Sequence, residues 1–166
     1  ELTGKQLFDS NVIIDLSRVG ATETKSLIMG MLVLKLQEYR ISEGSAMNST
    51  LRHITVLEEA HNILRRTSIE QPIESSNIMG KSVEMIANAI AEMRTYGEGF
   101  IIADQAPGLM DMSVIRNTNT KIIIRLPDRG DRELVGKAAN LNDDQIDELA
   151  KLPCGVAAVY QNEWIQ

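Results

Sequence analysis

The sequence predicts an α/β fold with a mostly parallel sheet that is flanked by helices. Short apolar runs of strand type alternate along the chain with helical patterns, and the run that ends at Leu57 is followed directly by two carboxylates, Glu58 and Glu59. In open α/β sheets, ligands bind at the carboxyl ends of the strands. We therefore expect a ligand-binding site where this strand ends.

The first half of the chain contains two expected strands and one expected helix. Residues 11–16 are predicted to form a strand. Residues 22–40 are predicted to form a helix whose apolar residues cover most of its circumference, a pattern that is typical of a buried helix. Residues 53–57 are mostly apolar and partly β-branched, which favours a strand buried in a parallel sheet. Residues 41–50 are predicted to be a surface loop, and residues 65–80 a long polar loop.

The second half continues the alternation. Residues 81–96 carry apolar side chains at spacings of three and four, which predicts an amphipathic helix that ends at Gly97. The remaining expected elements are strand 99–105, strand 121–126, helix 131–139, helix 142–151 and strand 155–160, with residues 161–166 beginning a hairpin. In the second of these helices, Asn142 and Gln145 have the spacing of a capping box.

The composition limits the functions that the chain can have. Its 166 residues, 43% of them hydrophobic, suffice for the core of one ordinary domain. The net charge of -6 provides no basic stripe, so a contact with nucleic acid would need a local patch or another segment. The single cysteine, Cys154, excludes an internal disulfide, and no apolar stretch reaches the ~20 residues of a membrane span. We therefore expect a cytoplasmic protein without a membrane segment.

Glu58 and Glu59 have the arrangement of the acids in a nucleotide-hydrolysing site. In P-loop ATPases, the acid that ends the strand holds Mg²⁺, usually through water, and the next carboxylate polarises the water that attacks the γ-phosphate. We assign these roles to Glu58 and Glu59, and we expect His61 and Asn62 to orient Glu59 or the phosphate of the nucleotide. The alternative is that the acids are solvated at the start of a helix, where its dipole favours negative charge, and that His61 is a structural hydrogen bonder.

A complete phosphate loop is missing from the sequence. Residues 19–26 end in Lys25 and Ser26, as a phosphate loop does, but both of its glycines are replaced. We therefore expect Lys25 to lie at the start of a helix. Because the chain begins at Glu1 rather than at methionine, we expect it to be part of a longer protein whose phosphate loop lies upstream of residue 1.

The run from Glu58 to Leu64 resembles the acidic motif of HerA-type ATPases, which belong to the HerA/FtsK group of ring-forming DNA translocases. Five further stretches resemble this family in the same order: residues 11–20, 92–99, 101–105, 117–126 and 152–160. The resemblance implies that residues 1–166 are the C-terminal portion of one RecA-like P-loop NTPase domain. It also implies that ATP and Mg²⁺ bind between neighbouring subunits of a homo-oligomer, expected to be a hexamer.

The resemblance assigns roles to three more residues. Gln105 would be the sensor that links the γ-phosphate to the sheet; its alternative is a hydrogen bond in the turn before Pro107. Arg94 and Arg125 are the candidates for an arginine finger that acts in trans, because a guanidinium stabilises a transferring phosphoryl group. The alternative for each arginine is an ordinary surface ion pair.

The resemblance implies that the full-length protein is an ATPase that drives a translocase or helicase along double-stranded DNA and works with a partner nuclease in DNA processing. We expect the present chain alone to bind ATP weakly and to hydrolyse none. Two alternatives remain open. The first is a conjugation or secretion-system ATPase motor, which moves protein or nucleoprotein. The second is a non-catalytic assembly module, in which the acids are merely solvated.

Overall fold

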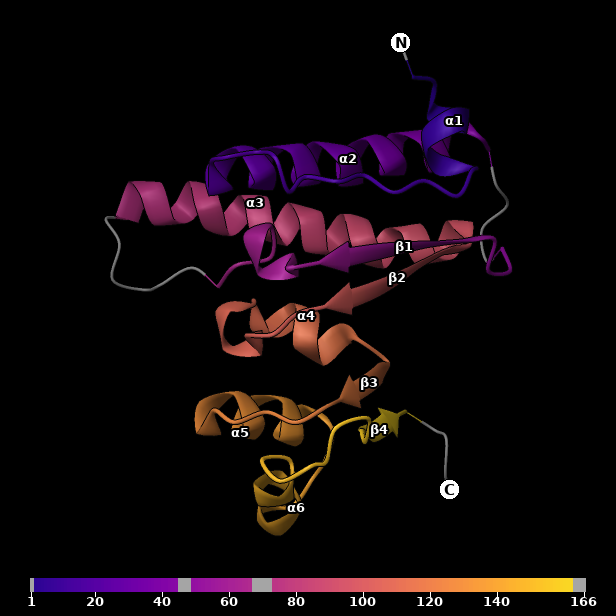
Figure 1. Ribbon diagram of the computed structural model, residues 1–166. Coiled ribbons are helices and arrows are strands. Elements are labelled where there is room, and N and C mark those ends of the chain that lie inside the picture. The colour runs from indigo at the N-terminus through magenta and orange to yellow at the C-terminus, as the bar shows by residue number, and fades with distance from the viewer. Residues whose placement is uncertain (1, 45–48, 67–72, 163–166) are drawn as a thin grey trace. The chain divides into compact units, whose positions relative to one another are not determined.

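The computed structural model describes residues 2–44, 49–66 and 73–162, without the side chains of residues 73–80 (Figure 1). The chain divides into two compact units, Glu1–Asp104 and Gln105–Gln166, which we call the first and the second unit. The predicted hairpin beyond residue 162 and the centre of the predicted loop 65–80 lie outside the described residues. No described helix has the length and apolar character needed to cross a membrane.

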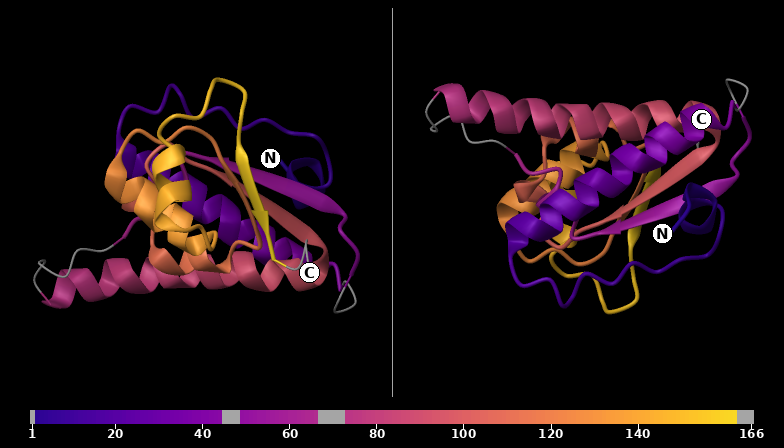
Figure 2. Two further views of the ribbon diagram at one scale, coloured as in Figure 1. Left: turned by 90° about the horizontal axis from the view of Figure 1, so that it is seen from below. Right: turned by 90° about the horizontal axis from the view of Figure 1, so that it is seen from above.

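In its described residues, the first unit is built from three helices and a pair of parallel strands. Its elements are α1 (Gly4–Phe8), α2 (Thr22–Ser42), β1 (His53–Glu58), the short turn η1 (Ala60–Asn62), α3 (Ile73–Met93), the short turn η2 (Arg94–Tyr96) and β2 (Glu98–Ala103). Strand β1 pairs in parallel with β2, from His53 opposite Glu98 to Glu58 opposite Ala103. Helix α2 packs on α3, and α3 runs along one side of the strand pair (Figure 2). The predicted α/β class with a parallel sheet flanked by helices is confirmed.

The strand pair is covered on one face only in the described part of the chain. Side chains alternate between the two faces of a strand, and Leu57 points to the covered face and is buried. On the other face, Ile54, Val56 and Ile101 are 48%, 57% and 51% exposed. The prediction that β1 is a buried strand is therefore wrong for this face, where the apolar side chains are about half exposed.

Two further predictions for the first unit need correction. Residues 11–16 form no strand, and Ile13 is almost fully exposed, because none of the described strands pairs with this segment. The predicted helix 22–40 is present as α2, but it is not buried all round. Its buried residues, which include Val33 and Leu36, lie in one stripe, whereas Leu27 and Met31 are exposed.

Helix α3 begins earlier than the sequence predicts. Residues 73–80 are helical and not part of a loop. The serines in this stretch suit a helix start as well as a loop, so polar composition did not distinguish the two. The predicted amphipathic pattern is confirmed, since Ile86, Ala89 and Met93 are buried at spacings of three and four. The predicted stop is also confirmed, because Gly97 adopts a φ of 81° after the final turn.

A buried ion pair connects α2 to the start of β2. Arg40 and Glu98 are 3% and 1% exposed, and the distance from Arg40 Nε to Glu98 Oε2 is 2.9 Å. The other carboxylate oxygen of Glu98 accepts a 2.6 Å hydrogen bond from Thr55 Oγ1 and lies 2.7 Å from His53 Nδ1. Burial of these charges is tolerated because each one has polar partners.

The second unit contains α4 (Met112–Asn117), β3 (Thr120–Ile123), α5 (Arg129–Ala138), α6 (Asp143–Glu148) and β4 (Ala158–Gln161), together with the short turn η3 (Pro107–Leu109). Strands β3 and β4 are antiparallel, which differs from the mostly parallel sheet predicted. The predicted capping box of Asn142 and Gln145 is confirmed at the start of α6. Ile123, Ala139 and Leu149 form the centre of the apolar core of this unit. The sequence did not predict α1 and α4, which are five and six residues long.

Candidate active site

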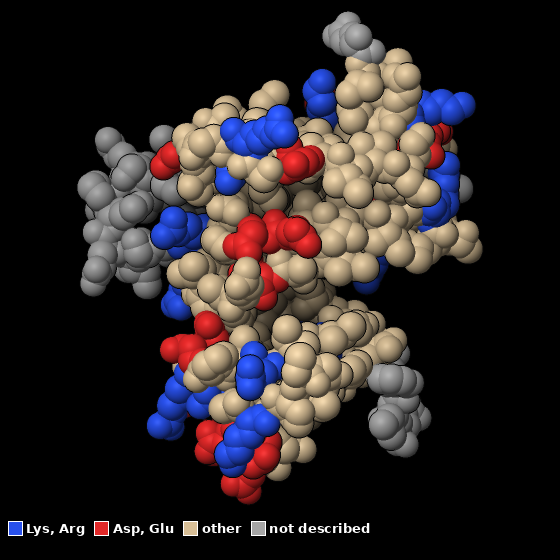
Figure 3. Space-filling view, in the orientation of Figure 1, with Lys and Arg blue, Asp and Glu red and all other residues tan. Residues whose placement is uncertain are grey.

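Two adjacent carboxylates lie at the carboxyl end of β1. Glu58 is the last residue of the strand and stands opposite Ala103 at the end of β2. Both Glu58 and Glu59 are exposed. Acidic side chains gather on the surface near the end of β1 (Figure 3). The structure therefore places the two predicted acids at the edge of the parallel sheet where α/β proteins bind ligands.

Glu59 has an unusual backbone conformation. Its φ of 51° and ψ of 45° lie in the left-handed region, which a residue with a Cβ seldom adopts. The carbonyl oxygen of Glu59 accepts hydrogen bonds of 3.0 Å from Asn62 N and 2.9 Å from Asn62 Nδ2. The turn that follows, η1, has only three residues, so the helix dipole of the alternative interpretation is small here. The chain turns sharply after β1, and the side chain of Glu59 is 48% exposed.

His61 is held by Asp104, which is the last residue of the first unit and follows β2. The carboxylate of Asp104 accepts a 2.8 Å hydrogen bond from the backbone N–H of His61. Its two oxygens also lie 2.9 and 3.1 Å from Nδ1 of the His61 ring. The Asp104 side chain is only 2% exposed. Turn η1 is thereby attached to the end of β2.

Sequence reasoning missed Asp104. A signal for it was nevertheless present, because Asp104 lies at the end of a predicted strand, as Glu58 does. The carboxyl ends of neighbouring parallel strands meet at one edge of a sheet, so polar residues that follow two such strands are expected to lie close together. The pairing of β1 with β2 brings Asp104 to His61 in this way.

The described residues of the site form no preformed cage for a metal ion. Within the described ranges, no group of three or more His, Cys, Asp or Glu side chains is arranged to hold one. Mg²⁺ usually takes one or two carboxylates and completes its shell with waters and substrate phosphates. An exposed strand-end carboxylate such as Glu58 suits that kind of ligation.

Of the other predicted catalytic residues, only Arg94 belongs to the first unit, and it lies at the opposite end of β1 from the two acids. Arg94 is exposed in η2, just before Gly97, whose carbonyl oxygen accepts a 2.8 Å hydrogen bond from Arg52 N at the start of β1. Because β1 has six residues, roughly 20 Å of strand separates this edge from Glu59. Gln105 and Arg125 belong to the second unit, and both are exposed.

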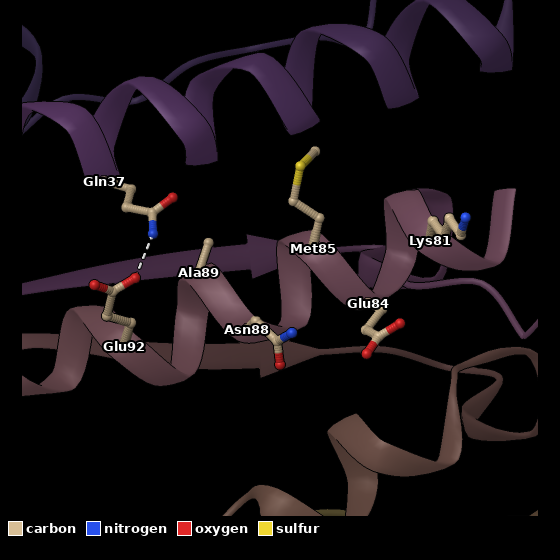
Figure 4. Close-up of a pocket in the computed structure, with 7 residues that line it drawn as sticks. All are labelled: Gln37, Lys81, Glu84, Met85, Asn88, Ala89 and Glu92. Atoms are coloured by element: carbon tan, nitrogen blue, oxygen red, sulfur yellow. Dashed lines mark hydrogen bonds between the residues drawn. The ribbon is translucent and has the colours of Figure 1, made fainter. Parts of the chain in front are cut away.

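A groove between α2 and α3 is separate from these residues. It has a volume of about 360 Å³, and its lining includes Gln37 from α2 and Lys81, Met85 and Glu92 from α3 (Figure 4). Gln37 Nε2 donates a 2.6 Å hydrogen bond to Glu92 across the groove. No residue predicted from the sequence as catalytic or ligand-binding lines this groove.

Comparison with known proteins identifies the relatives of the chain. It is 28% identical over 127 residues, 76% of its length, to the DNA double-strand break repair helicase HerA of Sulfolobus acidocaldarius. It is 30% identical over 107 residues, 64% of its length, to the protein of the same name from Pyrococcus furiosus. The chain is related to HerA-type proteins. No protein-family model matches it.

The HerA relationship confirms the resemblance that the acidic motif indicated. A further relative, the probable DNA double-strand break repair helicase HerA of Methanocaldococcus jannaschii, is 28% identical over 107 residues. The matched regions cover 23%, 18% and 19% of the three HerA proteins, so the chain spans about a fifth of the length of the curated relatives it matches. An α/β unit with a small parallel sheet is consistent with a part of a RecA-like core.

Proposed function

We propose that the full-length protein that contains this chain is an ATP-driven DNA translocase or helicase motor of HerA type. The observation that carries the proposal is the pair of carboxylates at the carboxyl end of β1, where Glu59 leaves the strand in a left-handed conformation. The relatives support a DNA motor, since they are named DNA double-strand break repair helicases. In this proposal, residues 1–166 are the C-terminal portion of one RecA-like domain.

Glu58 and Glu59 have different roles in the proposed reaction. Glu58, at the strand end, binds Mg²⁺ through water, and the bound ion would neutralise charge on the phosphate oxygens of ATP. Glu59 orients and polarises the attacking water, a role for which its carboxylate is sufficiently exposed. Asn62 supports this position by bonding to the carbonyl oxygen of Glu59. We also propose that His61, whose Nδ1 lies 3.7 Å from Glu59 Oε2, helps to orient the bound nucleotide.

The other proposed roles require neighbouring subunits. Arg94 is exposed at the edge of the sheet opposite to Glu59, which supports a role as an arginine finger in the site of a neighbouring subunit rather than in its own. Arg125 is the second candidate for this role, and Gln105 is the proposed sensor. These assignments require a ring, which we propose to be a homo-hexamer. We further propose double-stranded DNA as its track, a nuclease as its partner and the cytoplasm as its location.

The decisive experiment is steady-state ATP hydrolysis by the full-length protein, with and without duplex DNA. We expect Glu59→Gln to lower kcat by roughly 10²–10⁴-fold while nucleotide binding is retained, because only the general base is lost. Glu148→Gln is the matched control, since Glu148 is an exposed glutamate in an ion pair with Lys151. It should leave turnover unchanged.

Each outcome favours a different function. Turnover that rises with DNA and is lost in Glu59→Gln would support the DNA motor. Turnover without stimulation by DNA would favour a conjugation or secretion-system ATPase. No turnover in the wild-type protein would favour a non-catalytic assembly module and would contradict the proposal.

A further inference from the structure

Arg132, near the start of α5, is a buried arginine whose side chain bonds to the backbone. It is only 9% exposed. Its Nη1 donates a 3.1 Å hydrogen bond to the carbonyl oxygen of Leu126 and a 2.5 Å hydrogen bond to that of Pro127. Among the described residues, its side chain has no other hydrogen-bond partner, and its Nε is buried without one. The buried arginine of the first unit, Arg40, differs in that it binds two carboxylates.

The environment of Arg132 is unfavourable for a buried charge. Such a charge is tolerated when oppositely charged groups and hydrogen bonds satisfy it. The described residues provide Arg132 with two carbonyl groups but with no carboxylate. An apolar side chain of similar size would fill the same space without either cost. The contribution of Arg132 therefore lies in the segment that its two hydrogen bonds hold.

This segment, residues 124–128, connects β3 to α5 and contains Arg125. The backbone N–H of Leu126 donates a 3.2 Å hydrogen bond to the carbonyl oxygen of Leu149. Together with the two bonds from Arg132, it fixes the two residues that directly follow Arg125. The side chain of Arg125 is exposed and makes no hydrogen bond or ion pair with the described residues. The backbone of this segment therefore sets the direction in which Arg125 leaves the chain.

We propose that Arg132 is a positioning residue for Arg125. By holding the carbonyl groups of residues 126 and 127, it presents the guanidinium of Arg125 in one direction. An arginine finger needs this precision, because it binds the transferring phosphoryl group through N–H groups in a fixed geometry. A displacement of about 1 Å in a positioned group can cost roughly 10²-fold in rate. This inference rests on the proposed role of Arg125 as the arginine finger and adds a residue that does not touch the nucleotide.

The first test measures the segment without any turnover. Arg132→Met keeps much of the side-chain length but removes both hydrogen bonds to the carbonyl groups. In amide hydrogen exchange of the full-length protein, we expect residues 124–128 to exchange faster in this variant than in the wild type. Arg129→Met is the matched control, because Arg129 also belongs to α5 but is exposed and bonds to Glu133. It should leave this exchange unchanged. Unchanged exchange in Arg132→Met would overturn the proposal.

The second test measures whether Arg132 acts through Arg125. In the full-length protein, Arg125→Ala should lower kcat by roughly 10³–10⁵-fold, as the loss of an arginine finger does. Arg132→Met should lower kcat by roughly 10- to 100-fold while KM for ATP is unchanged. The double variant should have the same kcat as Arg125→Ala, because Arg132 has nothing left to position. A merely structural role would instead lower kcat further in the double variant.

The outcomes separate this inference from the proposed function. If the wild-type protein hydrolyses ATP and Arg125→Ala has the same kcat, the inference is wrong, and the proposed function stands with Arg94 as the arginine finger. A double variant slower than Arg125→Ala would also overturn the inference alone. If the wild-type protein shows no turnover with or without duplex DNA, the proposed function fails and the positioning role fails with it.

Discussion

Replacing Arg40 with methionine should strongly destabilise the first unit. The Arg40 side chain makes three short polar contacts: Nε with Glu98 at 2.9 Å, Nη1 with Asp9 at 2.7 Å, and Nη2 with the carbonyl oxygen of Phe8 at 2.6 Å. Methionine keeps much of the side-chain length but makes none of these contacts. The carboxylate of Glu98, which has no exposed surface, would then lose its only arginine partner among the described residues.

The expected loss follows from what remains around Glu98. Breaking a buried ion pair by removing one partner costs about 3–5 kcal/mol, because it leaves an uncompensated charge. In Arg40→Met, the hydroxyl of Thr55 still donates to Glu98, and Nδ1 of His53 remains 2.7 Å away. Asp9 is 28% exposed and can be solvated by water. These compensations place the expected loss at the lower end of the range, at about 3 kcal/mol.

The assay is urea unfolding followed through backbone amide resonances, which are read in the first unit for Arg40→Met and in the second unit for the control. Arg129→Met is the control, because the Arg129 side chain is 82% exposed and its ion pair with Glu133 contributes little. Replacing both buried charges, in Arg40→Met/Glu98→Met, should destabilise the unit less than Arg40→Met alone. A loss for Arg40→Met no larger than that for Arg129→Met would refute the reasoning.

Three further predictions concern other parts of the chain. The hydrogen bond to Asp9, followed by burial, raises the pKa of Tyr39 to about 12, so this contact stabilises the fold fully below about pH 10 and is lost as the pH rises through 12. In ¹³C-tyrosine NMR, Asp9→Asn should lower the pKa of Tyr39 toward 10.0, and a wild-type value near 10.0 would contradict the contact. Gly97→Ala should cost about 1–3 kcal/mol in urea unfolding, because φ is 81° and the added methyl group would meet a backbone carbonyl oxygen. Gly20→Ala, whose added Cβ would have no neighbour within 4 Å, is its control, and equal losses would contradict this account. Asn142→Ala should cost about 0.5–2 kcal/mol by removing the cap of α6, and unchanged protection of the amides of α6 would contradict that.

The elements that could be predicted from the sequence are those specified by local signals. The β-branched run of β1, the stop of α3 at Gly97 and the capping box at Asn142 each depend on residues that are close together in the chain, and all three are present. Elements that depend on distant partners were predicted less well. Residues 11–16 have the composition of a strand, but a strand also requires a neighbour, and none of the described strands provides one.

In the candidate site, too, the features set by neighbouring residues were predicted and those that depend on distant residues were not. The position of Glu58 and Glu59 at a strand end follows from the local pattern, and the structure places them there. The contact between His61 and Asp104 joins residues that are 43 positions apart, and it exists only because β1 and β2 pair in one register. The left-handed conformation of Glu59 was also not predicted, since glutamate has no preference for it. Helical periodicity and turn residues carry no information on either feature.

The conformation of Glu59 has a consequence for how this chain can change over evolution. The left-handed backbone conformation costs a glutamate roughly 1–2 kcal/mol. Glycine adopts this conformation without penalty, and asparagine adopts it more readily than glutamate does. Selection for stability alone would therefore favour glycine or asparagine at position 59. The glutamate at position 59 therefore carries a conformational cost that glycine would avoid. Stabilising screens that ignore activity should accordingly find position 59 among the first sites to improve.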